Sequence, residues 1–274
     1  MLRFHKYAPD PKLRNYVHYY FVISHGTAQN FSKEQFHTNH PQGTFDLMFT
    51  LSGGVQLENY KSESFQMKQI FVMAQQEGYF NLKFDQNTHM LGVVFYAESF
   101  SKLFNLPLSE LSNSGRQLTD DLSSDYQDFY DQLYHCKSDQ ERIHSLNQFI
   151  EKQLAQVDYS FDKMDMLIRS IRNGKASDKI EDLARASNLS ERTLQRKLKS
   201  SLGIGPKSFS KINRFKEVLV CISTHPEYDW QDLLFRFGYY DQAHFIKDFK
   251  RYTGKTPSEF LKTTDDLSNL FLEK

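Results

Sequence analysis

Two short polar stretches in the C-terminal third of the chain carry side chains of the kinds that recognise base edges. The first stretch contains Arg192, Gln195 and Arg196, followed by Lys199. An arginine guanidinium can donate two hydrogen bonds to guanine, and a glutamine amide can pair with adenine. The plainer interpretation of such a stretch is a solvated polar helix face. The elements predicted around this stretch are therefore needed to distinguish a base-contacting helix from a solvated one.

The second stretch offers an amide, a methyl group, an imidazole and an ammonium. Its members are Gln242, Ala243, His244 and Lys247. We expect both sets to contact bases. We expect Lys199, Lys250 and Arg251, nearer the C-terminal ends of the two stretches, to contact phosphates.

Both stretches belong to one sequence pattern that occurs twice. "GIGPKSF" (203–209) and "GKTPSEF" (254–260) share Gly-x-x-Pro-x-x-Phe. Upstream of them, apolar positions match at an offset of 50 and then 51 residues, in the pairs Ile180/Trp230, Leu183/Leu233, Leu194/Phe245 and Leu198/Phe249. A period held over so many positions indicates a repeated structural unit.

Each copy reads as a helix, a short turn and a second capped helix, over residues 179–203 and 229–254. We expect Asp178 and Asp229 to cap the first helices, and Ser190 and Asp241 the second. Glycine suits a helix end, and proline suits the first turn of the next helix. The motif residues are Gly203, Pro206, Phe209, Gly238, Gly254, Pro257 and Phe260. One long helix over 206–225 would fix the separation of the two units.

Net charge is zero over 274 residues, but its distribution is uneven. Residues 1–162 carry 13 Lys+Arg and 19 Asp+Glu, a net of −6, and residues 163–262 carry 20 and 12, a net of +8. Residues 263–274 add −2, which brings the sum to zero. A basic segment beside an acidic one predicts a polyanionic partner for the basic segment alone.

The first 118 residues are expected to form a β-rich domain. "TFDLMFTL" (44–51) and "YFNLKFD" (79–85) alternate apolar and polar residues, as half-buried strands do. The stretches 16–24, 68–74 and 90–97 are further apolar runs of strand length, and 112–117 reads as a loop. Several short, closely spaced strands favour a sandwich or barrel.

Residues 119–157 show helical spacing on both sides of "CKSDQ" (136–140), which predicts a helical hairpin. The hairpin could pack on the sheet or pair with a second subunit. From residue 163 to 262 the pattern is helical throughout. The predicted fold is therefore α+β and multidomain, with an all-α C-terminal domain.

On these motifs the C-terminal region resembles the AraC/XylS family of bacterial transcription regulators. The most specific stretch is "FIKDFKRYTGKTPSEF", and "INRFKEVLV" lies between the two units. The resemblance implies that the second helix of each unit enters the major groove of double-stranded DNA. The N-terminal stretch "HPQGTFDLMFTLSGG" resembles the cupin-like sensor domain of some of these regulators. That implies a small-molecule effector, a homodimer and contact with RNA polymerase.

Other kinds of chemistry find little support in the sequence. His37 and His40 have the spacing of metal ligands but no third ligand nearby, so we expect no metal and no cofactor. Cys136 and Cys221 are expected to be reduced thiols, and no run is long enough to span a bilayer. We expect a cytoplasmic protein that is not an enzyme. Two alternatives stay open: a constitutive regulator whose sheet only dimerises, and a cupin-type enzyme with an accessory DNA-binding module.

Overall fold

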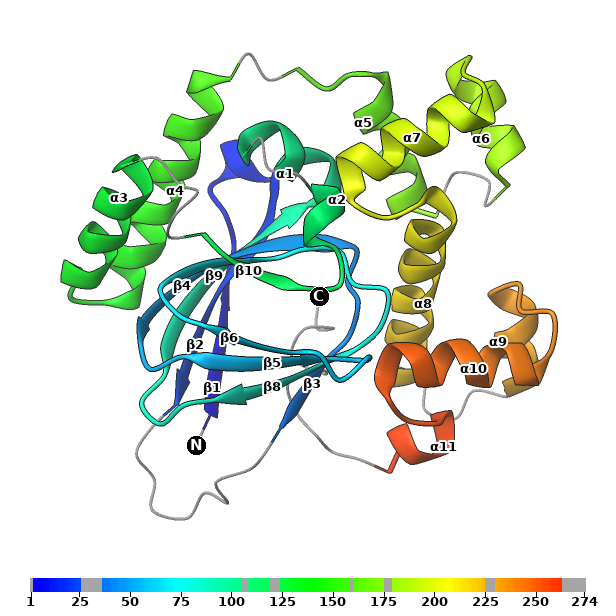
Figure 1. Cartoon of the computed structure of the whole chain (residues 1–274), viewed down its shortest axis with the longest axis horizontal. Coiled ribbons are helices and arrows are strands. Elements are labelled where there is room, and N and C mark those ends of the chain that lie inside the picture. Colours follow the sequence, from blue (N-terminus) through cyan, green and yellow to red (C-terminus); the bar gives the residue numbers. More distant parts are fainter. Residues whose placement is uncertain are drawn as a thin grey trace.

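The computed structural model describes residues 2–25, 36–104, 108–118, 124–157, 160–174, 179–224 and 230–262. Its N-terminal part is a sandwich of two antiparallel sheets, and its C-terminal part is helical (Figure 1). The predicted α+β organisation is confirmed. None of the helices in these ranges combines the length and the apolarity needed to cross a membrane.

The larger sheet has six strands in the order β1-β2-β9-β4-β7-β10. These strands are β1 (Leu2–Tyr7), β2 (Val17–His25), β9 (His89–Tyr96), β4 (Thr44–Ser52), β7 (Ile70–Met73) and β10 (Gly115–Gln117). The smaller sheet has four strands, β3 (His37–Asn39), β8 (Phe80–Phe84), β5 (Val55–Asn59) and β6 (Ser64–Met67). β1, β3, β5, β6 and β10 were not predicted from the sequence.

Strand β4 is buried on both faces, whereas its alternating sequence predicts burial on one face only. Phe45, Leu47 and Phe49 pack against the helices, and Met48 packs into the core between the two sheets. The larger sheet is thus the middle layer of the domain. A strand in a middle layer keeps its alternation but loses its solvent face.

The segment 112–117 is a loop only in its first half, so that prediction was wrong for its second half. Gly115, Arg116 and Gln117 pair with Met73, Val72 and Phe71 of β7. The pairing extends the sheet by one short edge strand. The residues of β10 do not alternate between apolar and polar. Such a short edge strand is ordered by its pairing with β7 and not by burial of its own side chains.

Helices cover the outer face of the larger sheet. They are α1 (Ala97–Phe104), α2 (Leu108–Leu111), α3 (Ser124–His135) and α4 (Asp139–Gln156). Phe100 of α1 stacks on Phe45 with ring centroids 4.8 Å apart, and Phe129 of α3 meets Phe49 edge-on at 5.5 Å. The hairpin α3–α4 therefore packs on the sheet, one of the two roles predicted for it.

Seven helices lie in the described C-terminal ranges 160–174, 179–224 and 230–262. They are α5 (Lys163–Arg172), α6 (Ile180–Ser187), α7 (Glu191–Leu202), α8 (Pro206–Thr224), α9 (Trp230–Arg236), α10 (Gln242–Thr253) and α11 (Pro257–Phe260). Asp162 caps α5 with a reciprocal capping box. Helix α8 runs alongside the sandwich and carries one helix pair at each end (Figure 1). Its apolar residues share one continuous core with the outer face of the larger sheet.

Candidate nucleic-acid interface and a cavity in the sandwich

Helix α7 presents the first polar stretch to solvent. The Ser190 side chain caps the helix by accepting a hydrogen bond from the Thr193 amide. Leu194 and Leu198 are fully buried against the rest of the unit. Because these leucines fix one side of the helix to the core, the opposite side must face outward.

The outward side of α7 contains every residue that the sequence predicts as a DNA contact there. These residues are Arg192, Gln195, Arg196 and Lys199, and all four are exposed. None of their side chains makes a hydrogen bond or ion pair with the described part of the chain. Their charges and donors are therefore available to an external partner.

The turn before α7 is held by Asn188, which has a left-handed backbone with φ 54°. Helix α7 ends at Gly203, also left-handed with φ 79°, and α8 begins at Pro206. Phe209 is fully buried three residues later. Asp178 and Asp229, the expected caps of the first helices, lie outside the described residues.

Helix α10 repeats this arrangement with different surroundings. The Asp241 side chain caps it by accepting a hydrogen bond from the His244 amide, and it ends at the left-handed Gly254. Phe245 and Phe249 occupy the buried positions. The exposed residues of the predicted set are Gln242, Ala243, Lys247, Lys250 and Arg251.

His244 and Arg251 of α10 are engaged within the protein. The His244 imidazole lies 3.5 Å from the Asp248 carboxylate and meets the ring of Tyr239, which follows Gly238 in the turn. Arg251 Nε donates a 2.6 Å hydrogen bond to the Glu77 carbonyl, in the loop between β7 and β8. Arg251, which the sequence predicts as a phosphate contact, is thus hydrogen-bonded to the sandwich in this conformation.

A second contact joins α10 to the sandwich through His40. The His40 imidazole is buried, and its Nδ1 lies 3.1 Å from the Tyr252 carbonyl oxygen. Burial lowers the pKa of His40 to about 4, against the opposing effect of that hydrogen bond. The sequence reasoning considered His40 only as a metal ligand and missed this role. Within the described ranges, no three His, Cys, Asp or Glu side chains are grouped to hold a metal ion.

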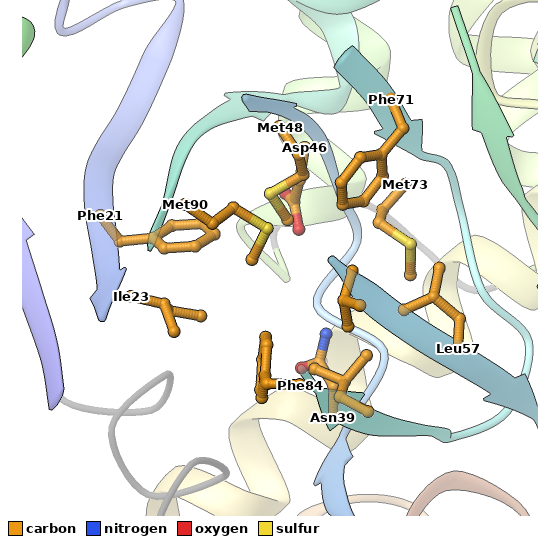
Figure 2. A pocket seen from close by; sticks show the side chains of 12 residues that line it. Phe21, Ile23, Asn39, Asp46, Met48, Leu57, Phe71, Met73, Phe84 and Met90 are labelled. Atoms are coloured by element: carbon orange, nitrogen blue, oxygen red, sulfur yellow. The ribbon is translucent and has the colours of Figure 1, made fainter. Parts of the chain in front are cut away.

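A narrow cavity lies between the two sheets (Figure 2). Its walls are mainly apolar and include Phe21, Ile23, Met48, Phe71, Met73 and Met90. Asp46 and Asn39 point into it, and both also line a smaller polar cavity beside it. Burial raises the pKa of the Asp46 carboxyl to about 7, although the Thr44 hydroxyl and the Lys216 ammonium oppose the shift.

Asp46 was not predicted as a functional residue, although the sequence contains a signal for it. It stands within "TFDLMF", on the face of the strand that alternates with Phe45 and Leu47. A carboxylate among apolar residues in the middle of a strand is unusual, because burying an unpaired charge costs free energy.

Comparisons with known proteins match each part of the chain separately. Residues 183–263 match a family model described as a helix-turn-helix domain, and residues 5–116 match a domain of unknown function, DUF6597. No curated protein matches the chain.

Among solved structures, ToxT from Vibrio cholerae O395 is 11% identical, with 96% of each chain covered and a TM-score of 0.45. ToxT from Vibrio cholerae strain SCE256 with a bound unsaturated fatty acid is 12% identical, with 88% of this chain and 93% of that chain covered and a TM-score of 0.44. The AraC-like transcriptional activator CuxR is 11% identical, with 79% and 86% covered and a TM-score of 0.28. These similarities are too low to transfer a ligand. The family match rests instead on residues 183–263, where the model covers α7 and α10 with their caps. Residues 183–263 of the chain are therefore a helix-turn-helix domain, the kind of domain that the resemblance to the AraC/XylS family predicts.

Proposed function

We propose that the protein is a sequence-specific transcription regulator that reads double-stranded DNA with two helices and responds to a small-molecule effector. The observation that carries the proposal is the pair of capped helices α7 and α10 on one connecting helix. Each helix turns polar side chains outward from a buried apolar side. This is the geometry by which a helix enters the major groove.

In this proposal α7 is the main reading helix. Arg192, Gln195 and Arg196 contact base edges, and Lys199 contacts a phosphate. Helix α10 reads with Gln242, Ala243, His244 and Lys247, and Lys250 and Arg251 bind phosphates. In this structure Arg251 Nε donates to the Glu77 carbonyl, so its Nη groups are the donors that remain for a phosphate.

The organisation we propose has three parts: a sensor domain over 1–118, a helical hairpin over 119–157 and the DNA-binding domain over 163–262. The hairpin is our candidate for a homodimer contact, since Tyr134 of α3 is 60% exposed. Contact with RNA polymerase, a cytoplasmic location and the absence of enzymatic activity follow from the proposed role.

Selection of bound sequences from a random DNA pool tests the proposal. We expect one enriched motif with two half-sites about one helical turn apart, in keeping with two reading helices on one face. The affinity for that motif should exceed the affinity for random DNA by about a thousandfold or more at physiological salt. Equal affinity for both would contradict sequence-specific regulation.

A further inference from the structure

The smaller polar cavity beside Asp46 is lined by buried hydrogen-bond acceptors that have no donor. Asn39 Oδ1 and Gln76 Oε1 are buried and make no hydrogen bond within the described part of the protein. Both side chains line this cavity together with Asp46. A buried acceptor without a donor destabilises the fold, because the group has lost its hydrogen bonds to water. Such a group therefore favours a guest that brings donors.

His40 adds a third acceptor to the same cavity. Its Nδ1 faces the Tyr252 carbonyl, which can only accept, so Nδ1 carries the proton. The low pKa of His40 keeps the ring neutral near pH 7, and Nε2 is then an acceptor. His40 Nε2 is buried and has no partner among the described residues.

The apolar part of the site can adapt to a guest. Met48, Met73 and Met90 all line the larger cavity. Methionine side chains are unbranched and flexible, so they can move aside for a ligand without disturbing the strands. An apolar chain or ring could therefore enter between the sheets while its polar end reached Asp46.

We propose that the two cavities together bind an amphipathic amine, with its apolar body among the methionines and its ammonium against Asp46, where Asn39 and Gln76 also accept hydrogen bonds. A carboxylate ligand is disfavoured in this position, because its charge would lie beside the Asp46 carboxyl group.

The polar cavity also borders the DNA-binding helices. A Cβ atom on Gly43, which lines this cavity, would lie 2.9 Å from Asn213 Oδ1 on α8. His40 binds the carbonyl of Tyr252 on α10. An ammonium bound to these acceptors would lie beside the contacts of Gly43 and His40, and so would alter the packing of the sandwich against α8 and α10. This regulatory consequence rests on the proposed DNA-binding function.

Calorimetric titration of the full chain with octylamine, octanol and octanoate tests the ligand class. We expect saturable binding of one octylamine per chain. The affinity for octanol should be lower by about tenfold or more, and the affinity for octanoate should be lower still. Octanoate binding as tightly as octylamine, or octylamine binding without saturation, would overturn the proposal.

The Asp46→Asn variant tests the assigned contact. It should weaken octylamine binding by about tenfold or more and change octanol binding by less than about threefold. The matched variant Asp128→Asn, on the exposed side of α3, should change neither. Unchanged octylamine affinity in folded Asp46→Asn protein would refute the ammonium–carboxylate pair.

If Asp46→Asn does not fold, the pH dependence of the unaltered protein serves in its place. Octylamine affinity should rise between about pH 6 and pH 7.5 as Asp46 ionises, and octanol affinity should stay flat. Of the neighbouring groups, His40 stays neutral in this window, burial raises the pKa of Tyr19 far above it, and the Lys216 ammonium, with its pKa near 8, stays largely charged. Flat octylamine affinity would count against the pair.

DNA binding is measured separately, so the two proposals fail independently. Selective DNA binding without octylamine binding would support the proposed DNA-binding regulator and contradict the proposed amine site. Octylamine binding with no change in DNA affinity would support the amine site and contradict its role in regulation.

Discussion

The two proposed reading helices have the same local construction, but the side chains on their polar faces have different partners. Both helices pack against the N-terminal part, α7 against α1 and α2. Helix α7 has an exposed face whose cationic side chains make no hydrogen bond or ion pair with the described part of the chain. Helix α10 is attached to the sandwich at its C-terminal end by Arg251, Tyr252 and the Tyr79 amide, which donates to the Arg251 carbonyl. If both helices bind DNA as proposed, we expect the contacts with the sandwich to affect the DNA affinity of α10 more than that of α7.

Arg196→Ala is expected to give the largest loss of DNA affinity. Losing a bidentate contact to a base should cost about 1–3 kcal/mol on the selected site and relax the preference at one base pair. Fluorescence anisotropy with selected and random duplexes measures both effects. The control Arg185→Ala, on the exposed side of α6, should cost little.

His244→Ala is the companion measurement on α10. Because His244 already interacts with Asp248, we expect it to cost a fraction of what Arg196→Ala costs. Equal losses at the two positions would contradict the expectation that a side chain already engaged within the protein contributes less to DNA binding.

His40→Asn should change how stability depends on pH. The folded-state pKa of His40 is lower than its unfolded value, so its contribution to stability is present above about pH 6.5 and is lost as pH falls toward 4. Each pH unit in that window costs up to about 1.4 kcal/mol in the unaltered protein. Thermal melts at about pH 7.5 and pH 5.5 should show a smaller difference for His40→Asn.

The exposed α4 residue His144 provides the control for that measurement. His144→Asn should keep the pH dependence of the unaltered protein. Asp46 acts in the opposite direction over the same window, because its pKa is raised. The comparison between variants cancels that contribution, and identical slopes for all three proteins would argue against His40.

Lys250→Ala should weaken binding to all DNA sequences alike. Removing one phosphate contact lowers the slope of log affinity against log salt by about one. Titrations across several salt concentrations measure the slope, with Lys152→Ala on α4 as the control. An unchanged slope would remove Lys250 from the set of phosphate contacts.

Glu77→Ala should give the smallest effect, and in the opposite direction. The Glu77 carboxylate accepts a hydrogen bond from Ser208 Oγ at 2.5 Å and lies 3.9 Å from Arg251. Its loss would loosen the hold on α10 and raise DNA affinity by up to about fivefold, as expected for a partly exposed ion pair. Lower affinity would mean that this contact positions α10 for DNA. Glu151→Ala, paired only weakly with Lys12, is the control.

The sequence predicts the elements better than it predicts their contacts. The strands β2, β4, β7, β8 and β9 follow from apolar alternation or apolar runs, and the two helix pairs follow from the repeat. These are local signals. β10 lacks such a signal, because its three residues are ordered by β7.

In the candidate site, too, local features could be predicted from the sequence and long-range contacts could not. The outward faces of α7 and α10 could be predicted, since helical spacing fixes which residues share a face. The roles of His40 and Glu77 could not, because their partners on α10 lie 212 and 174 residues away. Tertiary packing alone brings such groups together.

Gly203 and Gly254, which end α7 and α10, should differ in how well they tolerate substitution. A Cβ on Gly203 would lie 2.4 Å from the backbone oxygen of Leu108 on α2, whereas a Cβ on Gly254 would meet only the ring of Tyr79, at 3.2 Å. Asparagine accepts left-handed backbone, so it could replace Gly254 once the tyrosine ring shifts. At position 203 the obstacle is main chain, and substitution would require α2 to move away from α7. Among diverged relatives we expect glycine to persist at the first position and to be exchanged at the second.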